Sequence, residues 1–368
     1  MKINVRLIYL TAVIFLYSAV LSYAGERSLK VSKGGNLRVS VEAGDIKIST
    51  WDRDEIKVVN EDDEDEIRIE QSGNTVVIES DNSYGGTDLR INMPEQFNCE
   101  LETQSGEIMI NGTVKGNVEG STAGGDIRTE DIIGMLDLNT AGGNITTGNI
   151  KGDAELRSAG GDFVLGNVDG NVGLKTAGGN IFIKNVTRTI EVSTGGGNID
   201  IKKADGSISI STGGGNIDIF SAGGDINITT GGGNISINGG NGKIKLTTGG
   251  GNIDIDNLKG SINASSGAGN ITIAMNEVIG KSNLSTGMGD VTLSIPGNAK
   301  ATIVVDIGSV WETDLDEIMK NVISDFPLKS SKKNEDHDVL TLTYEINGGG
   351  SVLKIATGEG TVHLRKNR

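Results

Sequence analysis

The sequence has one cysteine, three prolines and two histidines in 368 residues, and aromatic residues make up only 4% of it. The single Cys99 has no partner for a disulfide within the chain, which excludes a disulfide-stapled fold. The scarcity of proline excludes a collagen-like chain, although glycine is abundant. Asp and Glu (49) outnumber Lys and Arg (33), so the net charge is −16. This charge disfavours nucleic acid as a partner, because nucleic acid binding requires a basic surface.

The first 24 residues predict a signal peptide. Lys2 and Arg6 precede an uncharged hydrophobic run from Leu7 to Leu21, and Ser22-Tyr23-Ala24 has the small-x-small pattern of a cleavage site. The run is shorter than the roughly 20 apolar residues that span a membrane comfortably. We therefore expect export and cleavage, with no stable membrane span left afterwards and a periplasmic, cell-surface or secreted location.

Short apolar-x-apolar segments recur every nine residues between Val118 and Ile273. Ile199 and Ile201 form one such segment, and Ile208 and Ile210 form the next. The apolar-x-apolar pattern places two side chains on the same face of a β-strand. Most of these segments have glycine two residues before them, and the chain contains 56 glycines. The pattern therefore predicts short strands separated by tight turns.

A second period, of eighteen residues, overlies the first. Asn or Asp precedes every other strand, at Asp126, Asn144, Asp162, Asn180, Asn198, Asn216, Asn234, Asn252 and Asn270. Thr or Ser stands four residues before each of these, at Thr122, Thr140, Ser158, Thr176, Thr194, Thr212, Thr230, Thr248 and Ser266. The repeating unit is therefore one coil of eighteen residues with two strands and two unlike turns.

A β-solenoid explains this longer period better than an antiparallel meander does. Solenoid coils stack about 4.8 Å apart, so equivalent Asn and Thr side chains reach their copies in the neighbouring coil. In a meander the same residues lie two strands apart and gain nothing from being alike. We predict an all-β fold, a single-chain parallel β-solenoid with two short strands per coil, in which the Asn/Asp and Thr columns form a structural ladder.

A single repeat buries too little apolar surface to fold alone, so the stack needs a cap at each end. We predict an N-terminal β cap over residues 25–101 and the solenoid over residues 102–295. Residues 296–368 are predicted to form a C-terminal cap, with a short helix starting near Thr313 and closing β-strands.

Several segments resemble a known bacterial family. They are Gly44-Asp-Ile-Lys-Ile-Ser-Thr-Trp-Asp, the Thr-x-Gly-Gly-Asn/Asp-Ile units, Ile323-Ser-Asp-Phe-Pro, Ile346-Asn-Gly-Gly-Gly and Thr357-Gly-Glu-Gly-Thr-Val. Together they resemble the bacterial adhesin-like β-solenoid family, a domain of unknown function, over nearly the whole mature chain. The resemblance implies a β-solenoid outside the cytoplasm, in some members associated with the cell envelope.

The columns do not predict a metal or cofactor site. A calcium-binding nonapeptide roll places Asp two residues before the inward aliphatic residue, whereas Gly occupies that position before Ile199 and Ile217. Asp200, Asp218 and Asp254 face outward on one predicted sheet, where we expect a solvated acidic surface and keep weak divalent cation binding as the alternative.

Two outward apolar residues, Val164 and Phe182, lie one coil apart and predict a small interaction patch. The outward residues from Asp200 to Asp254 mix Asp, Ser, Asn and Lys, which is too irregular for an ice-binding surface. Both histidines, His337 and His363, follow the repeats.

The tryptophans, Trp51 and Trp311, also lie outside the repeats, so the repeats offer neither histidine for acid–base catalysis nor tryptophan for sugar stacking. Carboxylate pairs occur everywhere on such an acidic surface, so they do not indicate an enzyme. We therefore predict a non-catalytic, exported adhesin or cell-envelope scaffold protein. Its expected partner is an envelope or extracellular protein or glycan. The alternative is a carbohydrate-active β-helix enzyme acting on envelope or extracellular polysaccharide.

Overall fold

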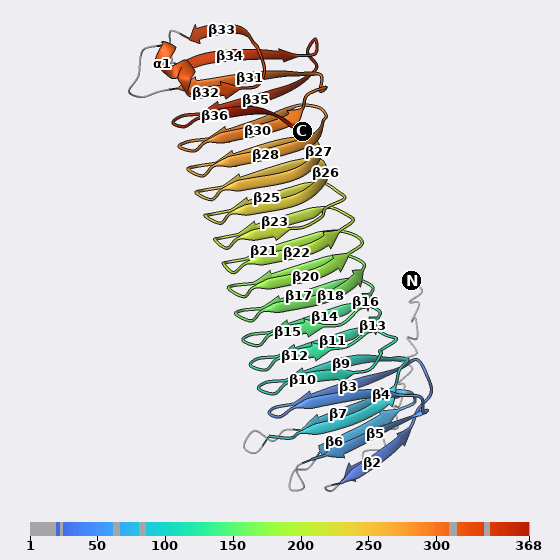
Figure 1. The fold of residues 1–368 in the computed structure, drawn as a ribbon. Coiled ribbons are helices and arrows are strands. Elements are labelled where there is room, and N and C mark those ends of the chain that lie inside the picture. The colour runs from blue at the N-terminus through green and yellow to red at the C-terminus, as the bar shows by residue number, and fades with distance from the viewer. Residues whose placement is uncertain are drawn as a thin grey trace, which may run out of the picture.

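The computed structural model describes residues 20–22, 25–61, 67–80, 86–308, 315–334 and 339–367. Most of the predicted signal peptide, the acidic segment 62–66, Trp311, Thr313 and His337 lie outside the described residues. The described chain forms a long stack of β coils, with the N-terminal strands at one end and the C-terminal strands at the other (Figure 1).

Successive coils pair in parallel and in register at a spacing of eighteen residues. Ile199 lies opposite Ile217, and Ile190 lies opposite Ile208. The backbone N–H of Ile199 donates to the carbonyl of Asn216 in the next coil, at 2.9 Å. The prediction of an all-β, parallel β-solenoid with two strands per coil is therefore confirmed.

One strand of each coil contributes to what we name sheet 1, whose strands mostly end at the Thr/Ser column. Its strands are β3 (Gly35–Val41), β7 (Thr75–Ser80), β9 (Phe97–Thr103), β11 (Val118–Thr122), β14 (Leu136–Thr140), β17 (Ala154–Ser158), β19 (Val172–Thr176), β21 (Ile190–Thr194), β23 (Ile208–Thr212), β25 (Ile226–Thr230), β29 (Ser282–Thr286), β35 (Ser351–Thr357) and the second halves of β26 (Ile235–Thr248) and β27 (Ile253–Ser266).

The other strand of each coil contributes to sheet 2, whose strands mostly start after the Asn/Asp column. Its strands are β4 (Ile46–Trp51), β8 (Leu89–Pro94), β10 (Ile108–Asn111), β12 (Ile127–Thr129), β15 (Ile145–Thr147), β18 (Phe163–Asp169), β20 (Ile181–Val186), β22 (Ile199–Ala204), β24 (Ile217–Ile219), the first halves of β26 and β27, β28 (Ile271–Val278), β30 (Val291–Pro296) and β36 (Val362–Asn367).

A third inward column, which we did not predict, completes the core. It lies between the two sheets, where β13 (Ile132–Ile133) pairs with β16 (Ile150–Lys151). Its buried members include Ile132, Ile150, Val168, Val186, Ala204, Ala222 and Leu258. They recur every eighteen residues and are nearly all apolar, so the signal was present in the sequence but falls outside the apolar-x-apolar pattern. Together with the two sheets, this column forms one continuous core cluster.

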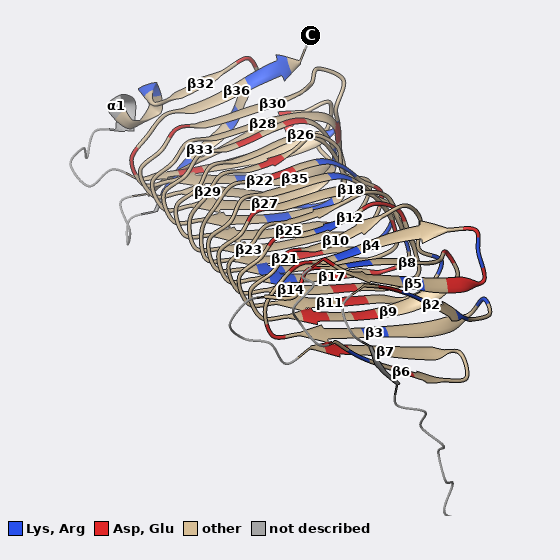
Figure 2. Ribbon diagram, turned by 90° about the horizontal axis from the view of Figure 1, so that it is seen from below, with Lys and Arg blue, Asp and Glu red and all other residues tan. Residues whose placement is uncertain are grey.

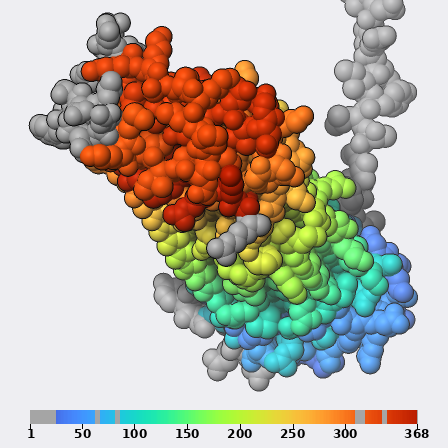
Figure 3. All heavy atoms as spheres, turned by 45° about the horizontal axis from the view of Figure 1, so that its top comes forward, coloured from blue at the N-terminus to red at the C-terminus, as the bar shows by residue number. Residues whose placement is uncertain are grey.

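Antiparallel pairs occur at both ends of the stack. At the N-terminal end β2 (Glu26–Lys30) pairs with β5 (Glu55–Asn60), and β6 (Ile67–Ser72) pairs with β7. In the uncleaved chain β1 (Val20–Ser22), which belongs to the predicted signal peptide, also pairs with β6. At the other end β31 (Ala301–Gly308) and β33 (Leu328–Asn334) both pair with β34 (Val339–Ile346). The C-terminal strands cover the near end of the stack in Figure 3.

Parallel stacking extends beyond the predicted solenoid limits of 102 and 295. The boundary at 101/102 falls inside β9, and β3 already pairs with β9 in parallel. Beyond residue 295 the coils are out of chain order: β35 and β36 return to pair in parallel with β29 and β30, and β31 and β32 pair in parallel with the other edges of β35 and β36. Long excursions between these outer coils remove the eighteen-residue spacing, so the sequence period does not reveal them. A capping role for the end strands stays a prediction.

The short helix α1 (Leu315–Lys320) begins two residues after the predicted start at Thr313, and β32 (Val322–Ser324) follows it. Lys320 lies in its last turn, where a cation interacts favourably with the helix dipole. Within the described ranges the structure contains no helix with the length and hydrophobicity to cross a membrane.

Candidate functional site

The Asn/Asp column forms a continuous hydrogen-bonded ladder along one edge of the stack. In each coil the side-chain Oδ1 accepts the backbone N–H of the equivalent residue one coil later. The distances are 2.8 Å from Asn144 to Asp126, 2.9 Å from Asn216 to Asn198, and 2.9 Å from Asn270 to Asn252. These side chains therefore hold the turns in place, and Asp satisfies the same requirement as Asn because the bond to the backbone N–H needs only an acceptor oxygen.

The Thr/Ser column lies just inside the same turns and is buried throughout. The Thr140 hydroxyl donates to the Gly125 carbonyl of the preceding coil at 3.0 Å and accepts the Gly143 N–H at 3.1 Å. Thr248 makes the equivalent bonds to Gly233 and Gly251. Because these hydroxyls satisfy buried backbone groups, the column joins neighbouring coils.

Two further ladders follow other turns and escaped the sequence analysis. In one, Asn149 Nδ2 donates to Asp131 Oδ1 at 2.9 Å, and Asn167 Nδ2 donates to Asn149 Oδ1 at 2.7 Å. In the other, the backbone N–H of Asn171 donates to Asp153 Oδ1 at 2.8 Å. That bond, with a second from the Asn171 side chain, holds the pKa of Asp153 below its usual value. Their eighteen-residue spacing is visible in the sequence, although each ladder is short.

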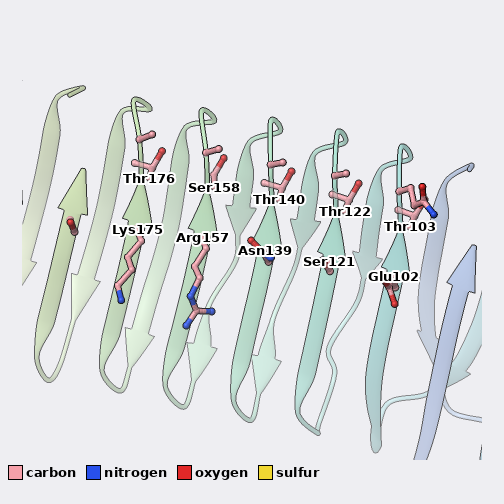
Figure 4. A pocket seen from close by; sticks show the side chains of 16 residues that line it. Glu102, Thr103, Ser121, Thr122, Asn139, Thr140, Arg157, Ser158, Lys175 and Thr176 are labelled. Atoms are coloured by element: carbon pink, nitrogen blue, oxygen red, sulfur yellow. The ribbon is translucent and has the colours of Figure 1, made fainter. Parts of the chain in front are cut away.

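The outer face of sheet 1 carries an open groove of about 630 Å³ that runs across successive coils (Figure 4). Exposed alanine methyl groups follow one side of it, at Ala123, Ala141, Ala159 and Ala177. Outward side chains of the strands follow the other side, at Glu102, Ser121, Asn139, Arg157, Lys175 and Ser193. The groove was not predicted, because its residues belong to six strands and line up only in the stack.

The same face is acidic toward the N-terminal end of the stack. Outward carboxylates occupy β9, β11, β14 and β17 (Figure 2). Arg157 Nη1 lies 2.8 Å from Asp137 Oδ1, and Arg157 Nη2 lies 3.5 Å from Glu155 Oε2. Glu100 pairs with Arg38 at 2.8 Å. The positive charges of Arg38 and Arg157 on this face are thus partly neutralised by neighbouring carboxylates.

The predicted patch of Val164 and Phe182 lies on the outer face of sheet 2. The two residues are cross-strand partners on β18 and β20, and Val164 is 42% exposed. Lys202 Nζ lies 5.7 Å from the centre of the Phe182 ring, within cation–π range. Phe220, which the sequence analysis did not single out, is 62% exposed and follows β24 two coils after Phe182. The face therefore carries an exposed phenylalanine beyond the predicted pair, with Lys202 on the coil between Phe182 and Phe220.

The outward residues from Asp200 to Asp254 lie on two different faces. Asp200, Asp218 and Asp254 lie on sheet 2, where Asp200 pairs with Asp218 across β22 and β24. Ser209 and Asn227 lie on sheet 1. Asp200 Oδ2 is 2.8 Å from Lys202 Nζ, so this carboxylate is part of an ion pair. Cation binding by this row stays a prediction.

The remaining candidate residues lie on strands distant from the Val164 and Phe182 patch or are buried. Trp51 is in β4, with its Nε1 donating to the Glu55 carbonyl at 2.8 Å. His363 is in β36 opposite Thr292 of β30. Cys99 is buried, as expected for a small hydrophobe, and burial raises the pKa of its thiol to about 12. Over the described residues, no group of three or more His, Cys, Asp or Glu side chains has a geometry suited to a metal ion.

Comparison with known proteins gives one family match and two structural matches. A candidate cell adhesion protein of Clostridium sporogenes ATCC 15579 shares 10% identity, with a TM-score of 0.15, over 93% of this chain and 99% of its own. A candidate adhesin of Bacteroides fragilis NCTC 9343 shares 12% identity, with a TM-score of 0.17, over 93% of this chain and 96% of its own. Among curated proteins no match was found.

The family match covers residues 169–364, which is just over half of the chain. It includes the later coils of the solenoid, with Phe182, Lys202 and Phe220, and the C-terminal strands as far as the first half of β36. The model that matches describes the Toastrack DUF4097 family. The chain therefore belongs to the Toastrack DUF4097 family.

Proposed function

We propose that this protein is an exported, non-catalytic, adhesin-like binding or scaffold protein of the cell envelope or extracellular space. The charged start, the hydrophobic run and the cleavage pattern of residues 1–24 support export. Membership of the Toastrack DUF4097 family, whose model covers the later coils, supports an adhesin-like role at a general level. Its partner is an envelope or extracellular protein or glycan.

The observation that carries the proposal is how the coil distributes its side chains. Inward residues form one continuous core, and the turn columns are occupied by hydrogen bonds between coils. The side chains that remain for recognition point outward on two long faces, one with an open groove and one with the patch around Phe182. A rigid rod with recognition on its outer faces suits binding to an extended partner.

The first experiment measures where the protein resides in the cells that make it. We expect mass spectrometry to find Gly25 as its first residue, and antibodies against the folded protein to label intact cells. Protease added to intact cells gives a second test of exposure. Purified protein treated with the same protease provides the reference, because a stacked solenoid resists cleavage even when it is accessible. Ile14→Arg, which interrupts the hydrophobic run, is expected to retain uncleaved protein in the cytoplasm, whereas the exposed Ser209→Ala serves as the matched control.

Uncleaved protein found only in the cytoplasm would overturn the proposal. Protein that is cleaved but protected until the outer layer is breached, like a periplasmic control, would replace the adhesin role with that of an internal envelope scaffold. The enzyme alternative is tested by incubating the purified protein with acidic and neutral polysaccharides. We expect polymer length to stay unchanged, and depolymerisation that is lost on a single carboxylate substitution would contradict a non-catalytic role.

A further inference from the structure

Among the phenylalanines of the described chain, Phe182 and Phe220 are not fully buried, whereas the others are. Phe97, Phe163 and Phe326 are buried, whereas Phe182 is half-buried and Phe220 is 62% exposed. Both unusual residues lie on the outer face of sheet 2, two coils apart, in the green and yellow-green part of the stack in Figure 1. An aromatic ring held in water on a rigid sheet loses the burial that normally stabilises it, so its position favours a role in recognition.

The ion pair between Asp200 and Lys202 lies on the coil between the two phenylalanines. Lys202, on the coil between them, extends over the Phe182 ring with Nζ 5.7 Å from the ring centre. Asp200 Oδ2 lies 2.8 Å from the same Nζ, so the Lys202 ammonium group is positioned both by this ion pair and by the Phe182 ring. Phe220 follows on the next coil, and its N–H donates to the Ile201 carbonyl at 2.9 Å. The rings are thus set on a backbone that the stack makes rigid.

Hydrogen-bonding groups flank the rings on the same face. Asp218 stands two residues before Phe220 and is exposed, and Ser236 is its cross-strand partner on the following coil. In register on successive coils, about 4.8 Å apart, the face thus presents the Phe182 ring, the carboxylates of Asp200 and Asp218, and the Ser236 hydroxyl.

This combination matches the chemistry of a sugar chain. The electron-rich face of an aromatic ring attracts the polarised C–H groups on one side of a sugar ring. Carboxylate oxygens accept hydrogen bonds from sugar hydroxyls, and a lysine ammonium donates to them. A protein partner requires a contiguous apolar centre, but here the Asp200–Lys202 ion pair separates the two phenylalanines. An anionic glycan is disfavoured because Asp200, Asp218 and Asp254 line the same face.

We propose that the outer face of sheet 2 around Phe182, Lys202 and Phe220 is a binding site for a neutral glycan chain. The site deepens the proposed function by naming the partner class, and it rests on that function. Phe182 and Phe220 supply the stacking surfaces, while Asp218 and Lys202 orient the sugar through its hydroxyl groups. The site is shallow, so affinity for a short oligosaccharide is expected in the range of about 0.1–1 mM.

The experiment titrates the purified protein with cellohexaose and with N-acetylchitohexaose as neutral probes, using calorimetry and saturation-transfer NMR. Oligogalacturonate is the anionic probe and a chitosan oligomer the cationic one. We expect saturable binding of at least one neutral probe, weakened about tenfold or more by Phe220→Ala and restored by Phe220→Trp. Met288→Ala is the matched control, because Met288 is 64% exposed and lies in a turn of another coil. Unchanged unfolding midpoints will show that these surface variants fold.

Three outcomes would overturn the inference. They are no saturation by either neutral probe at about 10 mM, equal affinity in wild type and Phe220→Ala, and tighter binding of the anionic or cationic probe. A partner protein that crosslinks to the face in wild type but not in Phe220→Ala, with both neutral sugars inert, would assign the face to a protein instead. None of these outcomes depends on the localisation experiment, so the failure of this site and the failure of the proposed function are distinguishable.

Discussion

The backbone N–H of Asn216 donates to Oδ1 of Asn198, one coil earlier, at 2.9 Å. The Asn198 N–H in turn donates to Asn180 Oδ1 at 3.0 Å, and the Asn234 N–H donates to Asn216 Oδ1 at 3.1 Å. Each turn is thus positioned by the one before it, so the eighteen-residue period is a structural requirement of the stack.

Replacing Asn198 with Ala is expected to lower the free energy of unfolding by about 1 kcal/mol, because the Asn216 N–H loses its acceptor on the protein and donates to water instead. Asn198→Asp is the matched control and should stay near wild type, since Asp162 accepts the Asn180 N–H at 2.7 Å. Urea unfolding followed by circular dichroism measures both. Equal losses in the two variants would show that the acceptor oxygen is not what matters.

Adjacent glycines of one turn are expected to differ sharply in their tolerance of a methyl group. A Cβ on Gly233 would lie 1.8 Å from the Gly215 carbonyl oxygen, whereas a Cβ on Gly232 would meet no atom within 4 Å. Gly233→Ala should therefore cost about 3 kcal/mol or more, and Gly232→Ala less than about 0.5 kcal/mol. Thermal and urea unfolding compare the pair, and similar stabilities would contradict the close stacking of turns.

Some buried threonine hydroxyls have no hydrogen-bond partner, and removing one of them is expected to stabilise the fold. In the described part of the chain, Oγ1 of Thr129 and of Thr147 is buried without a hydrogen-bond partner. Thr147→Val should therefore raise the free energy of unfolding by about 1 kcal/mol.

Thr140→Val is the comparison, because the Thr140 hydroxyl bonds to Gly125 and Gly143. Its loss leaves buried backbone groups unsatisfied and should cost about 2 kcal/mol. The ranking of Thr147→Val, wild type and Thr140→Val in urea midpoint is the measurement, and a destabilised Thr147→Val would indicate a partner such as a buried water.

Cys99 should behave as an inert thiol in the native protein. Burial raises its pKa from 9.0 to about 12, so the native thiol keeps its proton in a range where the unfolded thiol loses it. The native state then binds more protons, and the contribution of Cys99 to stability falls as pH rises from about 9 to about 12, by about 1.4 kcal/mol per unit.

The measurement compares the unfolding free energies of wild type and Cys99→Ala between pH 8 and about 10.5. We expect their difference to shrink as pH rises, and iodoacetamide to label Cys99 only after denaturation. Rapid labelling of the native protein at pH 8, or a constant difference, would contradict the burial of the thiol.

Much of the fold followed from the spacing of a few residue types. Ile199 and Ile201, with their copies eighteen residues on, were enough to predict strands, stacking and the inward faces, because a parallel stack places equivalent residues against each other. The Asn and Thr columns were predicted as a ladder, and the structure adds that the acceptors serve backbone N–H groups. The outer coils containing β3 and β4 were missed, since long insertions remove their regular spacing.

The candidate surfaces were less accessible to sequence reasoning. Val164 and Phe182 were singled out by their neighbouring positions, but Phe220 and Lys202 join them only because β20, β22 and β24 lie side by side. The groove of sheet 1 likewise needs side chains from six strands. The period in the sequence predicts which side chains point outward, but it does not predict which of them contact one another across strands.

What the sequence determined by itself was the repeating coil, because burial and hydrogen bonding in each coil depend on residues eighteen apart. What only the tertiary structure decided was which outward residues at different positions of the repeat come into contact. Phe182 and Lys202 are not equivalent in the repeat, yet Lys202 Nζ lies 5.7 Å from the centre of the Phe182 ring, because β20 and β22 lie side by side. Recognition depends on lateral neighbours across coils, and the geometry of the stacked coils determines that neighbourhood.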